Sequence, residues 1–197
     1  MVEQGPTPEQ FEIAVSRRTA FTAAIPKTVL DAEDRLPSAI AGLNASTRSK
    51  LHRIYILADE ISEIRAPFVA CTRGCAFCCH MNVTITSAEA ERLGKVIGRK
   101  PVSINRSLRR SREHFAGQPC TFLDNDAACS IYPDRPLSCR KHASFFEDAA
   151  PCRPEVMNDI EVPQVGFSGL DQALFTASAD RGEIVLADIR DFFPPAA

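Results

Sequence analysis

The sequence of 197 residues contains no apolar run that approaches the roughly 20 residues a membrane-spanning helix needs. Its first ten residues, MVEQGPTPEQ, are acidic and contain prolines, and they lack the basic and then apolar segments of a secretory signal. We therefore expect a cytoplasmic protein without a membrane partner. Thiols stay reduced in that compartment, so structural disulfides are not expected.

Several motifs of catalysis are also missing from the sequence. The chain has no Gly-rich phosphate loop, no Gly-x-Ser-x-Gly elbow and no His-Glu-x-x-His pair. Its net charge of −2 argues neither for nor against a nucleic-acid or membrane partner. The most basic stretch holds Arg106, Arg109, Arg110 and Arg112, which we interpret as a solvated helix face, so a nucleic-acid partner is not expected.

Cysteine is the residue type that stands out, and four of the eight cysteines fall within nine residues. Grouped thiols are poor core material, because they gain little over Ala or Val and oxidise easily. Thiolates held together need either a covalent bond or a positive centre, and a reducing compartment favours the positive centre. We therefore predict a metal site whose candidate ligands are Cys71, Cys75, Cys78, Cys79, Cys120, Cys129, Cys139 and Cys152.

The spacing within the first group suggests how the ligands are shared. The two-residue gap between Cys75 and Cys78 lets both sulfurs converge on one metal. Neighbouring side chains generally diverge, so Cys78 is expected to complete a site with Cys71 and Cys75, while Cys79 faces another site or is a spare thiol. The fourth ligand of the first site comes from either Cys139 or Cys152, and the sequence leaves that choice open.

Zinc and iron–sulfur clusters both suit ligation by cysteine alone. Structural zinc sites usually combine two short Cys-x2–4-Cys pairs, whereas the later cysteines here are separated by eight, nine and twelve residues. Three close cysteines with a distant fourth are more typical of a [4Fe–4S] cluster. We favour an iron–sulfur cluster, with zinc as the alternative.

Charged residues near the cysteines have two possible roles. Arg135 and Arg140 flank Cys139 and either donate N–H groups to anionic sulfurs or form surface salt bridges. His80 and His142 are either nitrogen ligands or ordinary solvated side chains beside the site.

The predicted fold is mainly α, with irregular cysteine-rich loops and a short β-hairpin, organised around the metal. A helical region over 1–66, a metal-binding core over 67–155 and a helical extension over 156–197 are expected to form one compact domain. A β-like run is expected at 83–86 and the hairpin at 121–132. Residues 26–46 are expected to be mixed in structure. Capping signals and apolar periodicity predict helices over 7–25, 47–65, 86–98, 102–116, 169–179 and 183–192.

Residues 68–142 resemble the CxxCxxCC cysteine-cluster family, a zinc- or iron-chelating domain typified by YkgJ-like, ferredoxin-like proteins. The resemblance is carried by the segments Cys71–Cys79, Pro119–Leu123, Cys129–Tyr132 and Arg135–Arg140. It implies that seven cysteines are ligands and leaves Cys152 outside the family pattern. Three residues rather than two separate Cys71 from Cys75, and the resulting Cys-x3-Cys-x2-Cys spacing also occurs in radical S-adenosylmethionine enzymes.

Three functions follow as hypotheses. The first is a metal-binding protein that holds an iron–sulfur cluster, or zinc, and transfers electrons or gives redox support to a protein partner. The second is a metal-dependent enzyme that modifies a protein or peptide, since a flagellin lysine methylase belongs to the same broad group. The third is a structural zinc domain that mediates protein contacts.

Overall fold

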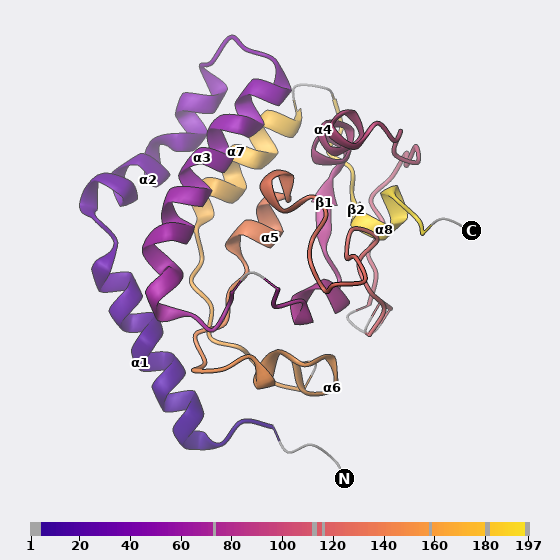
Figure 1. The fold of residues 1–197 in the computed structure, drawn as a ribbon. Helices are drawn as coiled ribbons and strands as arrows, with labels where there is room; N and C mark the ends of the chain where they lie inside the picture. The colour runs from indigo at the N-terminus through magenta and orange to yellow at the C-terminus, as the bar shows by residue number, and fades with distance from the viewer. Residues whose placement is uncertain are drawn as a thin grey trace.

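A computed structural model describes residues 5–72, 74–111, 114–115, 117–157, 159–179 and 182–195. The chain is mainly helical, with one two-stranded antiparallel sheet, which confirms the predicted fold class (Figure 1). The α-helices are α1 Pro8–Ala24, α2 Lys27–Ala41, α3 Thr47–Arg65, α4 Ser87–Ile97, α5 Leu137–Lys141, α6 Pro154–Met157, α7 Ser168–Ala179 and α8 Ile189–Phe192. Short 3-10 helices are η1 Ala66–Phe68, η2 Phe77–His80, η3 Tyr132–Asp134 and η4 Ala150–Cys152, and the strands are β1 Thr84–Thr86 and β2 Leu186–Asp188.

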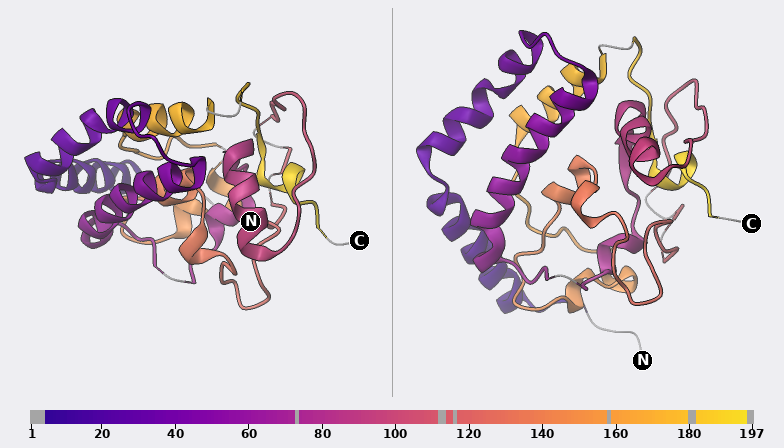
Figure 2. Two further views of the ribbon diagram at one scale, coloured as in Figure 1. Left: turned by 90° about the horizontal axis from the view of Figure 1, so that it is seen from above. Right: turned by 45° about the horizontal axis from the view of Figure 1, so that its top comes forward.

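Two bodies of secondary structure flank the cysteine-bearing loops. The long helices α1, α2, α3 and α7 lie on one side, while the sheet, α4 and α8 lie on the other (Figure 2). Each side has its own apolar cluster: one contains Phe21, Leu51 and Phe145, and the other contains Ile85 and Phe193. The loops are therefore supported by packed structure from both directions.

Helix starts follow the local sequence closely. Thr7 and Gln10 form the predicted capping box of α1, and Thr86 and Glu89 form that of α4. At α3, the Ser46 hydroxyl accepts a hydrogen bond from the backbone N–H of Ser49. The structure therefore confirms these three predicted helices. Their start signals could be read from the sequence because each involves only residues within one turn.

Helix α2 occupies a stretch that was expected to be mixed, although Pro37 lies inside it. Pro37 has no N–H to donate to the carbonyl of Glu33 one turn earlier. Gly169 of α7 lies against that same carbonyl, because a Cβ at position 169 would stand 2.2 Å from the Glu33 oxygen. The Glu33 carboxylate also accepts a hydrogen bond from the Leu170 N–H at 2.9 Å. Close packing with α7 thus stabilises a helix that its proline disfavours.

The predicted helix over 102–116 is wrong for the residues that the structure describes, and Arg112 lies outside them. Residues 101–111 form an irregular segment that bonds to distant backbone: Val102 N–H donates to the Phe192 carbonyl, and Leu108 N–H donates to the Leu186 carbonyl. Leu108 packs on the second apolar cluster. These long-range bonds satisfy the backbone in place of helical ones.

The predicted helix over 183–192 is wrong over most of its length. Residues 186–188 form β2, which pairs with β1 in the register Thr84↔Asp188 and Ile85↔Ala187. Only the short helix α8 follows, capped by the Asp188 side chain. The strand forms because β1, about a hundred residues earlier in the chain, offers it a partner. The hairpin expected at 121–132 contains one bridge, between Leu123 and Cys129.

Candidate metal centre

Cysteine side chains line a cavity of about 260 Å³, whose wall is formed mainly by the cysteine-bearing segments. All eight cysteines are free thiols, and none of them forms a disulfide. Seven of the predicted ligands reach the cavity wall, and Cys152 is buried elsewhere. The seven are Cys71, Cys75, Cys78, Cys79, Cys120, Cys129 and Cys139.

The first cysteine segment enters the cavity directly after α3 and η1. Ala70 N–H donates to the Ser144 carbonyl at 3.0 Å, and the Cys71 sulfur accepts a hydrogen bond from the Ser144 N–H at 3.3 Å. Gly74 then turns the chain with a φ of 93°, a conformation that glycine adopts readily. The turn leads into η2, which carries both Cys78 and Cys79.

The second cysteine segment runs beside the first. Cys120 N–H donates to the Cys79 carbonyl at 2.7 Å, and Gly117 N–H donates to the His80 carbonyl at 3.1 Å. The Leu123–Cys129 bridge folds the chain back toward the cavity. Backbone pairing thereby brings together cysteines that lie some forty residues apart in the sequence.

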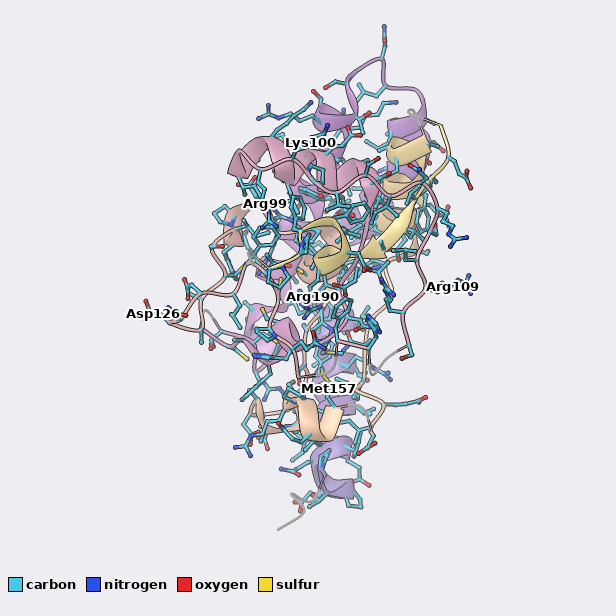
Figure 3. The ribbon with its side chains drawn as sticks, turned by 90° about the vertical axis from the view of Figure 1, so that its right-hand side faces the viewer. Arg99, Lys100, Arg109, Asp126, Met157 and Arg190 are labelled. Carbon is cyan, nitrogen blue, oxygen red and sulfur yellow. The ribbon has the colours of Figure 1, made fainter. Side chains whose placement is uncertain are left out.

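Arg190 links these two segments through hydrogen bonds to backbone carbonyls of both. Arg190 belongs to α8 and is labelled in Figure 3. Its buried guanidinium donates to the carbonyls of Cys79 at 3.0 Å, Gln118 at 2.8 Å and Met81 at 3.0 Å, and it pairs with buried Asp188 at 3.0 Å. Sequence reasoning missed Arg190, because a single arginine in a C-terminal segment carries no local signal for this role.

Arg140 and Arg65 act in a similar way on the segment that carries Cys139. Arg140 donates to the Arg135 carbonyl at 2.8 Å and the Pro133 carbonyl at 2.6 Å, and it pairs with Asp59. Arg65 donates to the Arg140 carbonyl at 2.7 Å. The N–H donors of Arg140 therefore bond to carbonyls and a carboxylate rather than to sulfur.

A buried polar network sets the start of α5, two residues before Cys139. The Glu89 carboxylate accepts hydrogen bonds from the Leu137 N–H and from the Tyr55 hydroxyl, both at 2.9 Å. Guanidinium carbons of Arg92 and Arg140 lie 4.9 and 4.5 Å from the centre of the Tyr55 ring. Burial raises the pKa of Glu89 despite these donors. This network was not predicted, since its members come from three separate helices.

Thiol acidity at the cavity is set mainly by burial. Burial raises the pKa of Cys139, and the neighbouring thiols of Cys120, Cys79 and Cys129 raise it further. Burial also raises the pKa of Cys120, to about 11. Cys79 differs. A hydrogen bond from the Cys78 thiol and the charge of Arg190 lower the pKa of Cys79 to about 7. Most of these sulfurs are therefore protonated near neutral pH, and a metal must displace protons to bind.

Electrostatic coupling divides the cysteines into two sets. Cys139 interacts with Cys79, Cys120 and Cys129. Cys152 instead interacts with Cys71 and Cys75, and burial raises its pKa to about 11. Cys78 connects the sets, because its pKa, raised chiefly by the hydrogen bond to Cys79, also responds to Cys139 and Cys71.

The histidines lie differently with respect to the cavity. His142 lines it, and burial followed by the charge of Arg65 lowers the pKa of its imidazole, which favours the neutral form that binds metals. The His80 ring nitrogen Nδ1 lies 3.2 Å from the Ala76 carbonyl, within its own turn.

Thiolate is a soft ligand that suits zinc and iron–sulfur clusters, so the donor set fits a metal. Across the described ranges, no three Cys, His, Asp or Glu side chains already converge as ligands of one ion do. The sulfurs surround a cavity rather than a point.

Comparison with known families agrees with this chemistry. Residues 70–158 match the CxxCxxCC family, described as "Putative zinc- or iron-chelating domain". The match covers under half of the chain but includes every cysteine, and it extends past Cys152, whereas the resemblance seen in the sequence ended at residue 142. No curated protein and no solved structure matches the chain. Among the described residues, no helix has the length and apolar character needed to cross a membrane.

Proposed function

We propose that the cysteine cavity binds an iron–sulfur cluster that serves electron transfer or redox support of a protein partner. The observation that carries this proposal is the lining of one cavity of about 260 Å³ by seven thiols. A zinc ion and a [4Fe–4S] cluster each take four cysteines, but the sulfurs that bind zinc must all lie about 2.3 Å from one point. A cluster is larger, so it suits sulfurs that surround a volume.

The division into two sets suggests how ligands are shared. Cys79, Cys120, Cys129 and Cys139 form one set of four. Cys71, Cys75 and Cys152 form the other, with Cys78 next to both. The hydrogen bond between Cys78 and Cys79 gives no support to the prediction that these two cysteines belong to different sites. The interaction of Cys152 with Cys71 and Cys75 favours Cys152 over Cys139 as the distant member of the first set.

The surroundings suit a redox site. Buried Arg65 and Arg190 place positive charge beside Cys71 and Cys79, respectively, which offsets thiolate charge. Cys71 itself is exposed. An exposed ligand shortens the path for electrons between a bound cluster and a docking partner. When bound, the cluster would supply one-electron chemistry, and the chain would hold it and stabilise its charge.

Anaerobic purification followed by metal analysis and visible spectroscopy tests the proposal. We expect iron and acid-labile sulfide, with broad visible absorption that bleaches on reduction. Cys75→Ser and Cys129→Ser should each lower the metal content and the melting temperature, because site formation is coupled to folding. A colourless protein with stoichiometric zinc would overturn the iron–sulfur assignment, and unchanged metal content in both variants would overturn the site.

A further inference from the structure

Arg135 has a side chain whose hydrogen-bonding capacity is incompletely used. It lines the cysteine cavity, and its guanidinium carbon lies 4.1 Å from the centre of the Tyr132 ring. Its Nε atom is buried and has no hydrogen-bond partner among the described residues. An unsatisfied buried donor lowers stability, and it does so more strongly when the group is charged. Such a donor indicates a missing acceptor.

The neighbouring arginines show how unusual this is. Arg140, Arg65 and Arg190 are each buried and direct their donors to backbone carbonyls, carboxylates or, for Arg65, also a serine hydroxyl. Arg140 uses Nε, Nη1 and Nη2 in this way, and its Nε partner is the carbonyl of Arg135 itself. Arg135 is thus held by its backbone while its Nε remains unpaired.

The surroundings of Arg135 identify the acceptor by its chemistry. The positive charge of Arg135 acts on the thiols of Cys71 and Cys129, one from each set. No Asp or Glu is among the described residues that line the cavity. Thiols are weak acceptors while protonated, but metal-bound thiolates carry negative charge and accept strongly. The acceptor that fits is therefore a cysteine sulfur in its metal-bound form.

We infer that Arg135 is a further anion-stabilising residue of the metal site, one that donates its Nε–H directly to a metal-bound cysteine sulfur, whereas Arg140 has a purely structural role. The inference rests on the proposed function, because the acceptor exists only when metal is bound. The cation–π contact with the Tyr132 ring opposes movement of the guanidinium away from the cavity wall. Arg135 is thus a positioning and charge-balancing residue rather than a ligand.

The experiment compares Arg135→Gln and Arg135→Lys with wild type in the full chain, purified anaerobically with its metal. The first measurement is metal retention against a chelator, which applies to iron and zinc alike. We expect Arg135→Gln to release metal at least about tenfold faster, since a charged hydrogen bond of about 1.5 kcal/mol corresponds to that factor. Arg135→Lys keeps the charge and should recover part of the loss.

The second measurement is the reduction midpoint of the cluster. Reduction adds negative charge, which a donor to sulfur stabilises, so Arg135→Gln should move the midpoint to more negative potential. Arg106→Gln serves as the matched control, because Arg106 is exposed and does not line the cavity. Its metal retention and midpoint should equal those of wild type.

The outcomes separate this inference from the proposed function. Metal-loaded Arg135→Gln with wild-type retention and midpoint overturns the role of Arg135 while leaving the metal site intact. A protein that binds zinc alone overturns the cluster, and chelator retention then decides the role of Arg135. A wild-type chain that binds no metal overturns both.

Discussion

The guanidinium of Arg190 lies 3.0 Å from the carbonyl oxygen of Cys79, although 111 residues separate the two in the chain. The same guanidinium reaches the carbonyls of Pro119 and Gln118, so one buried side chain joins both cysteine segments. The sulfurs therefore depend on the C-terminal part of the chain for their placement.

Replacing Arg190 tests this dependence. Arg190→Ala leaves Asp188 buried without its cation and removes the link between the segments, so we expect the free energy of unfolding to fall by about 3–5 kcal/mol. Chemical denaturation monitored by circular dichroism measures the loss. Arg190→Lys keeps the charge but not the fork of donors, and it should recover only part of the stability. Wild-type stability in both variants would contradict the role of Arg190 in joining the two cysteine segments.

Gly169 permits a test that is remote from the cysteines. Gly169→Ala places a methyl group against the Glu33 carbonyl, and we expect it to destabilise the protein by at least about 2 kcal/mol. Metal content per folded molecule should not change, because α2 and α7 contribute no cavity residue among those described. A variant as stable as wild type would show that the two helices are not packed as closely as the structure has them.

Metal affinity should depend steeply on pH. Burial raises the pKa of Cys120 to about 11 and raises that of Cys139, so both thiols bind protons at neutral pH. Each proton that metal displaces makes the apparent affinity rise about tenfold per pH unit below the thiol pKa. Competition with a chelator between pH 6 and 8 should therefore show tighter binding at the higher pH. A flat profile would indicate sulfurs that are already ionised.

Glu89 should make stability depend on pH in the opposite direction. Its pKa is raised by burial above the ordinary value of 4.5, so the folded state holds the proton longer than the unfolded state. The stability it contributes is full below about pH 4.5 and is lost as the pH rises through the folded-state pKa. Glu89→Gln should flatten that part of the stability–pH curve. An unchanged slope would assign the dependence to other groups.

Two cysteines distinguish the sets. If Cys152 completes the set of Cys71 and Cys75, Cys152→Ser should lower metal stoichiometry and leave the metal bound near Cys139 in place. Cys139→Ser should do the converse. Metal analysis of both variants, with a spectrum of each, provides the comparison. Full metal content in Cys152→Ser would restrict the ligands to the seven cysteines of the cavity.

Local signals predicted much of the fold. The capping pairs Thr7 with Gln10 and Thr86 with Glu89 placed two helix starts correctly, because each pair needs only its own turn. The segment 102–111 failed for the opposite reason. Its Leu108 N–H donates to the carbonyl of Leu186, a distant partner that no local sequence pattern predicts.

By itself, the sequence determined that the chain carries a set of grouped thiols and therefore the chemistry of a thiolate metal site, because side-chain type alone sets what an atom can ligate. Only the tertiary structure decided what surrounds those sulfurs. Arg65, Glu89 and Arg190 reach the cysteine loops from three distant segments. Their roles arise because buried charges and carbonyls must find partners, and folding alone brings such partners together.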